Sequence, residues 1–378
     1  MCQMLNYKTC CVLMICVAAI YIVYYLKWIK VDKNYERIFH QSLSKNISKK
    51  ILFWTTVFGS SDVSHLGCKS FNCIVTNNKS LLSTSDAVVF HFSDINYDNL
   101  PNRAFKLQKF IYFTMEAPFS TKNYEAPKNY FNWIMSYNRK SDVLYQYGSK
   151  WIVVNESNNH RLDNNYKNIL LKKKHKKIIG FISNCKSNSG REQVIKKLSK
   201  LMPIDIYGKC SNDETKKFGC RSNNKECEKN LINSYYFYLA LENAVCNDYI
   251  TEKYWSRYMY DSVPIVMRRD IYINTGIPNS SLISISDYKT SKEMVEHLNY
   301  LMNNPKEYLK YFEYRNTNIK VMSWDQFNLI NGICALCNKL NDYVSIQSQN
   351  RIYDVLQLYS SINNCTTSKN AIAFINNW

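Results

Sequence analysis

Residues 235–267 carry the pattern that decides the fold, YYFYLALENAVCNDYITEKYWSRYMYDSVPIVM. The apolar runs at residues 235–241 and 263–267 are short and bounded by polar residues, as is typical of buried strands. Between them, residues 251–260 have the pattern of a helix. A strand, a helix and a second strand predict two parallel strands, with Glu242 and Asn243 at a carboxyl end. Ligands of open α/β sheets bind at that edge.

Similar apolar runs continue this pattern along most of the chain, in two series. The expected strands lie at residues 51–55, 73–76, 87–92, 110–114 and 133–135, and at residues 178–183, 204–207, 235–241 and 263–267. Helical patterns at residues 191–201 and 291–302 accompany the second series. Strands that alternate with helices predict parallel, doubly wound sheets. Two series predict two Rossmann-like domains that face one cleft.

The N-terminal segment predicts a single membrane-spanning helix. Residues 9–26 contain no charged residue and have lysines on both sides, and about 18 residues suffice to cross a bilayer. We expect a cytoplasmic tail at residues 1–8, an anchor at 9–29 and a stem at 30–50. A cleaved signal peptide is the alternative, but residues 24–28 offer no small-x-small cleavage site. The lysines that follow the anchor mildly oppose a lumenal position for the rest of the chain.

Composition limits the class of protein and of partner. The 378 residues carry a net charge of +19, which favours an anionic partner. Hydrophobic residues make up 46% of the chain, enough for packed cores, so a disordered chain is excluded. Ten of the 14 cysteines follow the anchor, which favours an oxidising compartment and disfavours nucleic acid as the partner. Five N-glycosylation triplets also follow it, at Asn46, Asn78, Asn155, Asn279 and Asn364.

Motifs for metals and for common nucleotide-binding folds are missing. The sequence has no G-x-G-x-x-G, no Walker loop, no Asp-x-Asp and no His-Glu-x-x-His. We therefore expect no resident metal. The negative charge of a ligand then has to be met by helix N-termini and cationic side chains.

The segment after the strand at residues 235–241 holds the densest group of candidate ligand-binding residues. Thr251 is placed to open a helix whose free N–H groups attract an anion, and Lys253 adds a full charge. Tyr249 offers a ring for stacking on a base, and Glu252 offers acceptors for sugar hydroxyls. The alternative is ordinary structure, in which Thr251 caps the helix, Glu252 complements its dipole and Tyr249 packs.

The same segment belongs to a longer series of motifs. In chain order they are FTMEAP (113–118), FNWIMSY (131–137), SD (141–142), YG (147–148), SNC (183–185) with Arg191, YGKC (207–210), EN (242–243), DYITEK (248–253), SVPIV (262–266) and CALC (334–337). Together they closely resemble the signature of the α1,3-fucosyltransferase family. The resemblance runs from about Ile51 to Leu340.

The resemblance implies a Golgi type II membrane enzyme of GT-B architecture. It implies transfer of L-fucose from GDP-β-L-fucose to the 3-hydroxyl of N-acetylglucosamine in a glycoprotein or glycolipid glycan, with inversion of the anomeric carbon. Glu116 then corresponds to the general base, and Lys253 and Arg191 to the cations that stabilise the departing GDP. Further donor-binding positions of the family match Asn243, Tyr249 and Glu252.

The implied organisation has an acceptor-side domain at residues 51–165, a GDP-fucose domain at 166–340 and an extension at 341–378. We expect no required cofactor, with a divalent cation as a non-essential activator at most. The expected partners are GDP-fucose, an N-acetylglucosamine-containing glycan and a membrane. The sequence leaves N-acetyllactosamine, LacdiNAc and a chitobiose core open as acceptors. A catalytically inactive lumenal glycan-binding homologue is the alternative, although it would not need to retain a base.

His91 is the candidate acceptor-side residue. It aligns with a paired-histidine segment of many family members, but Phe92 replaces the second histidine here. A histidine that faces the core is the alternative.

Cys334 and Cys337 form a CxxC pair with two interpretations. Half of a zinc site is one, but the sequence has no second CxxC to complete it. Disulfides with Cys68 and Cys73 are the other, with three possible connectivities. The resemblance favours links from Cys68 and Cys73 to the Cys334/Cys337 pair.

Overall fold

The computed structural model describes residues 48–378 except 64–65, 67, 69–70, 122–124, 154–163, 173 and 221–223. The predicted anchor at residues 9–29 lies outside the described residues. Among the helices that are described, none is both long and apolar enough to cross a membrane.

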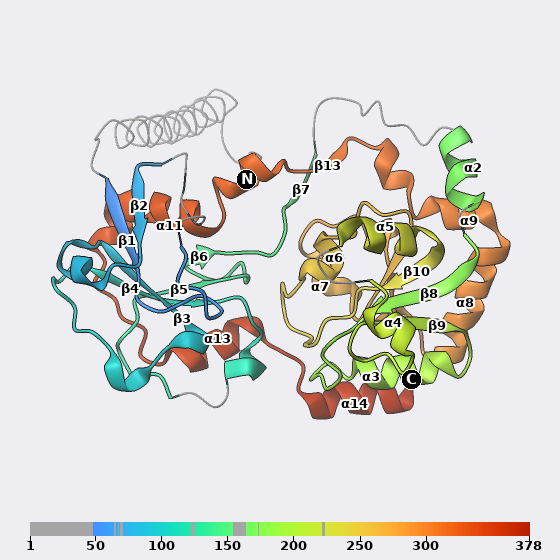
Figure 1. Ribbon diagram of the computed structural model, residues 1–378, viewed down its shortest axis with the longest axis horizontal. Helices are drawn as coiled ribbons and strands as arrows, with labels where there is room; N and C mark the ends of the chain where they lie inside the picture. Colours follow the sequence, from blue (N-terminus) through green and yellow to red (C-terminus); the bar gives the residue numbers. More distant parts are fainter. Residues whose placement is uncertain are drawn as a thin grey trace, which may run out of the picture.

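Two parallel sheets form two lobes that lie side by side (Figure 1). The first sheet has the order β2-β1-β3-β4-β5-β6 and the second β12-β11-β10-β8-β9. The strands of the first are β1 (Lys49–Phe53), β2 (Cys73–Thr76), β3 (Ala87–His91), β4 (Lys109–Thr114), β5 (Trp133–Ser136) and β6 (Val143–Leu144). Those of the second are β8 (Lys176–Phe181), β9 (Ile204–Tyr207), β10 (Tyr235–Leu239), β11 (Val263–Val266) and β12 (Ile283–Ser284). Counted from its own first strand, each sheet contains the 2-1-3-4-5 order of flavodoxin-like doubly wound folds.

The predicted strands are confirmed, because each expected apolar run overlaps a strand of one of these sheets. The helices expected at residues 191–201 and 291–302 are also present, as α3 (Arg191–Ser199) and α8 (Ser291–Asn303). The length of the helix expected at 251–260 is wrong, because α6 (Glu252–Trp255) is followed by a turn. In this turn, Arg257 pairs with buried Glu228 at 2.8 Å. The other α-helices are α2 (Asn164–Lys172), α4 (Glu214–Phe218), α5 (Lys225–Asn233), α7 (Arg269–Ile273), α9 (Pro305–Lys310), α10 (Trp324–Asn328) and α12 (Tyr343–Gln347).

Helices from the C-terminal part of the chain cover the first sheet. Within the described residues, the connections between its strands hold only 3-10 turns, η3 (Lys79–Thr84), η4 (Phe92–Asp94), η5 (Tyr97–Asn99) and η6 (Pro118–Thr121). Instead, α11 (Gly332–Asn341) packs on one face and α13 (Val355–Asn363) on the other. The sequence grouped α11 with the GDP-fucose domain and α13 with an extension, whereas both helices complete the core of the first lobe.

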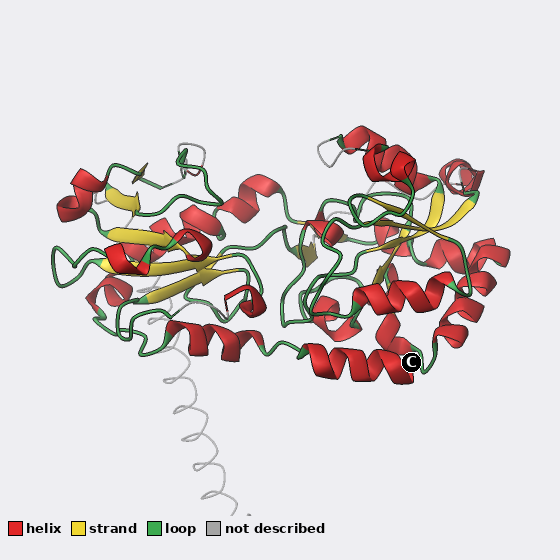
Figure 2. Ribbon diagram, turned by 60° about the horizontal axis from the view of Figure 1, so that its bottom comes forward, coloured by secondary structure: helices red, strands yellow, loops and turns green. Residues whose placement is uncertain are grey.

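The chain passes between the lobes more than once (Figures 1 and 2). β7 (Trp151–Val153) pairs antiparallel with β13 (Ile319–Val321), and Trp151 packs in the core of the second lobe. After α13, the chain returns to that lobe, where α14 (Ser368–Asn377) packs through Ile375. Gly148 lies so close to Trp255 that an added Cβ would be 2.0 Å from its ring. The lobes are therefore joined by several segments.

Five disulfides pair all ten cysteines of the described residues. The bonds Cys68–Cys334 and Cys73–Cys337 confirm the links from Cys68 and Cys73 to the Cys334/Cys337 pair that the resemblance implies. The other three were not predicted and are Cys185–Cys210, Cys220–Cys227 and Cys246–Cys365.

Three of the predicted N-glycosylation sites lie in the described part of the chain. Asn78, Asn279 and Asn364 are exposed, so a glycan at any of them would not disturb a core. Asn46 and Asn155 lie outside the described residues. The use of all five sites stays a prediction.

The two disulfides of α11 should stabilise the fold non-additively. Either disulfide alone closes a loop of 264 or 266 residues. When one disulfide is already present, the other closes a loop of only about ten residues, and its removal costs ~2–3 kcal/mol by chain entropy. When the second disulfide is removed as well, the long loop opens. This costs ~5 kcal/mol in addition to the loss caused by removing the first. Urea unfolding of Cys68→Ala/Cys334→Ala, Cys73→Ala/Cys337→Ala and the combined variant measures this. A combined loss equal to the sum of the two single losses would contradict it.

Candidate active site

The carboxyl ends of β8 and β10 form the switch point of the second sheet, where the strand order reverses. The backbone N–H groups of Asn188 and Ser189 donate to the carbonyl oxygen of Asn243 at 3.0 and 3.1 Å. The hydroxyl of Ser189 donates to the carbonyl of Glu242 at 2.6 Å. The loop before α3 is thus fixed to the segment after β10, at the place where doubly wound sheets bind ligands.

Glu242 and Lys253 form a buried ion pair at this edge. Glu242 is 5% exposed and accepts hydrogen bonds from the backbone N–H and the hydroxyl of Thr251, each at 2.8 Å. The Nζ atom of Lys253 lies 3.3 Å from Oε2 of Glu242 and 3.0 Å from Oε1 of the more exposed Glu252. Burial acts to lower the pKa of Lys253, but the two carboxylates outweigh it and the pKa is raised. Lys253 is therefore a fixed positive charge.

Thr251 has the structural role that the sequence left open. Its hydroxyl accepts from the backbone N–H of Lys253 at 3.4 Å and caps α6. α6 has four residues, so its dipole is small and the side chain of Lys253 supplies most of the positive charge.

Arg191 is buried, with 2% of its surface exposed. Its guanidinium donates to the carbonyl of Leu241 at 2.9 Å and to that of Asn184 at 2.7 Å, and Nε lies 3.4 Å from Glu192. Arg191 therefore ties the loop after β8 to the end of β10. Its charge is close enough to that of Lys253 to lower the pKa of the lysine.

Glu116 follows β4 of the first lobe and faces the second lobe. Its backbone N–H donates to the hydroxyl of Thr114 at 3.1 Å, and its carboxylate accepts from the hydroxyl of Tyr249 at 3.4 Å. Burial raises the pKa of Glu116, and the charge of Lys253 and the Tyr249 hydrogen bond offset only part of that rise. The structure thus brings together the expected carboxylate of one lobe and the expected lysine of the other.

Tyr249 does not present its ring for stacking on a base. It is 3% exposed and packs against Tyr137 and Tyr147, with ring centroids 4.8 and 6.2 Å away. The expectation of a stacking platform is therefore not supported, because the ring is enclosed by aromatic side chains. The hydroxyl serves Glu116 instead.

Two tyrosines that the sequence analysis did not select hold the segment of Glu116. Tyr359 on α13 donates to the carbonyl of Glu116 at 2.7 Å, and Tyr147 donates to that of Met115 at 2.8 Å. Tyr147 belongs to a recognised motif, so a signal existed for it. Tyr359 lies beyond residue 340, where the motifs end, and only the fold reveals its role.

His91 belongs to the core of the first lobe. It is fully buried against the rings of Phe58 and Phe113, and Nδ1 lies 3.5 Å from Asp94. Burial lowers its pKa, although Asp94 opposes this. The expected direct contact with an acceptor is not supported, because the imidazole does not reach the surface.

A cavity of about 320 Å³ lies near His91, at the carboxyl ends of β1, β2 and β3. Trp54, Thr56, Asn77, Asp94 and Asn96 contribute to its lining. It occupies the switch point of the first sheet, between β1 and β3, and therefore corresponds in position to the edge of the second sheet between β8 and β10. Among the described residues, no group of three or more His, Cys, Asp or Glu side chains is placed to hold a metal ion.

Two doubly wound parallel sheets, with a carboxylate of one lobe near a largely buried lysine of the other, place the protein among the two-lobed α/β proteins. Residues 46–148 match the family model of the fucosyltransferase N-terminal domain, and residues 171–358 match that of glycosyltransferase family 10 (fucosyltransferase), C-terminal. The chain therefore belongs to the fucosyltransferases of glycosyltransferase family 10, as the motifs predict.

Individual relatives agree with this assignment. The chain is 33% identical over 305 residues to alpha-(1,3)-fucosyltransferase fut-5 of Caenorhabditis elegans, covering 79% of this chain and 77% of that one. It is 33% identical over 278 residues to 4-galactosyl-N-acetylglucosaminide 3-alpha-L-fucosyltransferase 9 of Cricetulus griseus, covering 70% and 71%. Its fold is similar to the crystal structure of an alpha1,3-fucosyltransferase with GDP-fucose, with a TM-score of 0.51, 17% identity, and coverage of 82% and 94%.

The two carboxylates that contact Lys253 should differ in their effect on stability. Glu242→Ala removes the buried carboxylate beside Lys253 and leaves the N–H of Thr251 without its acceptor, and should lower the free energy of unfolding by about 3 kcal/mol. Glu252→Ala removes a carboxylate whose side chain is 56% exposed, and should cost less than about 1 kcal/mol. Urea unfolding compares the variants, and equal losses would contradict the buried pair.

Proposed function

We propose that the chain is an inverting α1,3-fucosyltransferase of GT-B architecture. It would transfer L-fucose from GDP-β-L-fucose to the 3-hydroxyl of N-acetylglucosamine in glycoprotein or glycolipid glycans. The observation that carries the proposal is the carboxylate of Glu116, which faces Tyr249 and Lys253 of the opposite lobe. The names of the relatives support the linkage, and the related fold has been solved with GDP-fucose.

Glu116 is proposed as the general base. An inverting transfer needs a group that takes the proton of the acceptor hydroxyl as it attacks the anomeric carbon. The raised pKa of Glu116, which burial causes, makes it a stronger base than an exposed carboxylate. Its backbone is held by Thr114 and Tyr359, so the carboxylate is already oriented before substrates bind.

Lys253 and Arg191 are proposed to stabilise the GDP leaving group. Negative charge grows on the diphosphate as the glycosidic bond breaks, and fixed cations in a desolvated crevice favour that state. Lys253 supplies a charge held in place by Glu242. Arg191 donates to two backbone carbonyls, so it contributes chiefly its charge and the shape of the loop.

Asn243 and Glu252 are proposed to bind the nucleoside and the sugar of the donor. The Oδ1 atom of Asn243 is buried and has no hydrogen-bond partner among the described residues, so it can accept from an N–H or hydroxyl of a ligand. The carboxylate of Glu252 is exposed, and although burial acts to raise its pKa, Lys253 lowers it. It therefore remains an acceptor for sugar hydroxyls.

The acceptor is proposed to approach from the first lobe. The cavity at the switch point of that sheet combines the ring of Trp54 with hydroxyl, amide and carboxylate groups. Aromatic rings with a few polar groups suit a sugar, which has apolar ring faces and many hydroxyls.

We also propose a Golgi location, as a single-pass type II membrane protein anchored by residues 9–29. The five disulfides support an oxidising compartment such as the secretory pathway.

The proposed reaction is tested by incubating the purified protein with GDP-fucose and a glycan array, with and without EDTA. We expect new fucose on the 3-hydroxyl of N-acetylglucosamine in both conditions. Mass spectrometry with linkage analysis identifies the product. No fucosylation of any glycan, or fucose on another position, would refute the proposal.

Glu116→Gln should abolish transfer but leave GDP-fucose binding largely intact. The amide keeps the size of the side chain but cannot accept the proton, so the rate should fall by about 10²–10⁴-fold. Turnover and isothermal titration with GDP-fucose measure the two properties. Near-normal turnover would exclude Glu116 as the base.

Tyr249→Phe should shift the acid limb of the pH–rate profile upward. The base must be deprotonated, so kcat/KM falls as the pH decreases through the pKa of Glu116. The Tyr249 hydrogen bond lowers that pKa, so its loss should move the midpoint to higher pH. Tyr308→Phe is the matched control, because this buried tyrosine donates to the carbonyl of Tyr236 instead. An unchanged midpoint in Tyr249→Phe would contradict the contact.

A further inference from the structure

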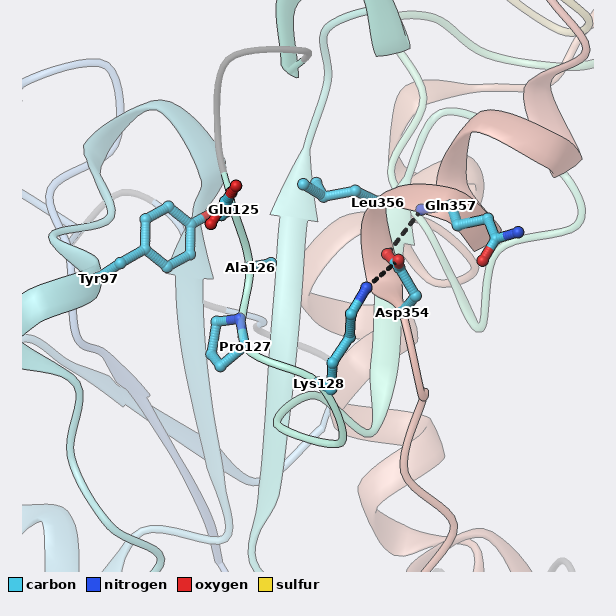
Figure 3. A pocket seen from close by; sticks show the side chains of 8 residues that line it. All are labelled: Tyr97, Glu125, Ala126, Pro127, Lys128, Asp354, Leu356 and Gln357. Carbon is cyan, nitrogen blue, oxygen red and sulfur yellow. Dashed lines mark hydrogen bonds and ion pairs between the residues drawn. The ribbon is translucent and has the colours of Figure 1, made fainter.

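A second cavity, of about 650 Å³, lies between the connection that follows β4 and the start of α13 (Figure 3). Tyr97 of η5, which follows β3, forms one wall together with residues 125–128, which follow β4. Asp354, Leu356 and Gln357 at the start of α13 form the other. The volume is within the range of binding sites for small molecules. Residues 125–128 lead into β5, so the cavity lies on the face of the first sheet that α13 covers.

The cavity is directly connected to the segment of the proposed base. Tyr359 of α13 holds the carbonyl of Glu116 at 2.7 Å. Leu356, in the cavity wall, precedes Tyr359 by about one helical turn, which corresponds to about 5 Å along the axis. The loop at residues 125–128 continues from η6, which packs against α13. α13 therefore forms part of the cavity wall and also holds the segment of Glu116.

The lining combines apolar and polar groups. Tyr97, Pro127 and Leu356 supply apolar surface, and Figure 3 shows the ring of Tyr97 beside Glu125. Lys128 reaches across to the other wall and pairs with Asp354. Asp354 also accepts from the backbone N–H of Gln357 at 2.9 Å.

The same lining selects for a neutral ligand. Rings and aliphatic groups pack on the apolar faces of sugars, and carboxylate and amide groups bind their hydroxyls. Glu125 and Asp354 face a single cation, Lys128, which is already paired. A phosphate or a sialic acid would therefore meet net negative charge.

We propose that this cavity is a second acceptor subsite, which binds neutral sugars of the glycan at a distance from the N-acetylglucosamine that receives fucose. This inference rests on the proposed function. It assigns α13 a role in selecting extended glycans over short ones. Because α13 lies beyond the recognised motifs, this preference would be a property of the C-terminal segment.

The test compares short and long acceptors on the full-length chain in detergent. The short acceptors are N-acetyllactosamine and N,N′-diacetylchitobiose, and the long one is a desialylated biantennary N-glycan, which contains both disaccharides. We expect the KM of the long acceptor to be about tenfold lower, equivalent to 1.4 kcal/mol of added binding. In Glu125→Gln/Gln357→Ala this ratio should fall to about two, with kcat and the KM for GDP-fucose unchanged.

Gln347→Ala is the matched control, because this exposed glutamine lies on α12, outside the cavity. It should keep the tenfold ratio. Equal KM values for short and long acceptors in the wild-type enzyme, or an unchanged ratio in the double variant, would overturn the subsite alone. No transfer to any acceptor would instead refute the proposed function and the subsite with it.

Discussion

The first sheet can be stable only if both of its faces are covered, and its own connections do not cover them. Strands β3 and β4 are buried along their whole length, as parallel strands usually are. In most doubly wound folds the crossover helices provide this cover. Here, short 3-10 turns join the described parts of the strands, and α11 and α13 supply the missing layers from more than 200 residues further along the chain. The first lobe is therefore not complete until the C-terminal segment has folded onto it.

This long-range packing also determines the geometry of the active site. α13 covers a face of the sheet and, through Tyr359, holds the backbone of Glu116. The Cys246–Cys365 disulfide then joins the segment after α13 to the loop that precedes Tyr249. Between the lobes, Arg139 donates to both carboxylate oxygens of Asp248 at 2.8–3.0 Å. The contact between Glu116 and Tyr249 is thus supported from both lobes.

Local patterns in the sequence predicted the features that depend on neighbouring residues. The apolar runs gave the strands, and the motifs gave the family, Glu116, Lys253 and the α11 disulfides. The roles of Tyr249 and His91 could not be predicted, because burial depends on which side chains surround a residue in space. The cover that α13 supplies could not be predicted either, since the periodicity of a helix does not show on which sheet it packs. The position of α11 beside the first sheet follows from the disulfides that the resemblance implies. The implied domain boundary at residue 340 grouped α11 with the second lobe, whereas it packs in the first. Segments that are adjacent along the chain need not be adjacent in space.

The two carboxylates around Lys253 have unequal positions, and this matters for a site that must receive a diphosphate. Without a ligand, both Glu242 and Glu252 pair with the lysine. Breaking the pair of Glu242 and Lys253 would leave two mostly buried charges without their partner, at a cost of about 3–5 kcal/mol. Breaking the exposed Glu252 pair costs less than about 1 kcal/mol. Under the proposed function, an incoming diphosphate would need to displace only Glu252, and it would meet a lysine that Glu242 still holds in place. The same proposal leaves the carboxylate of Glu252 free to bind the sugar.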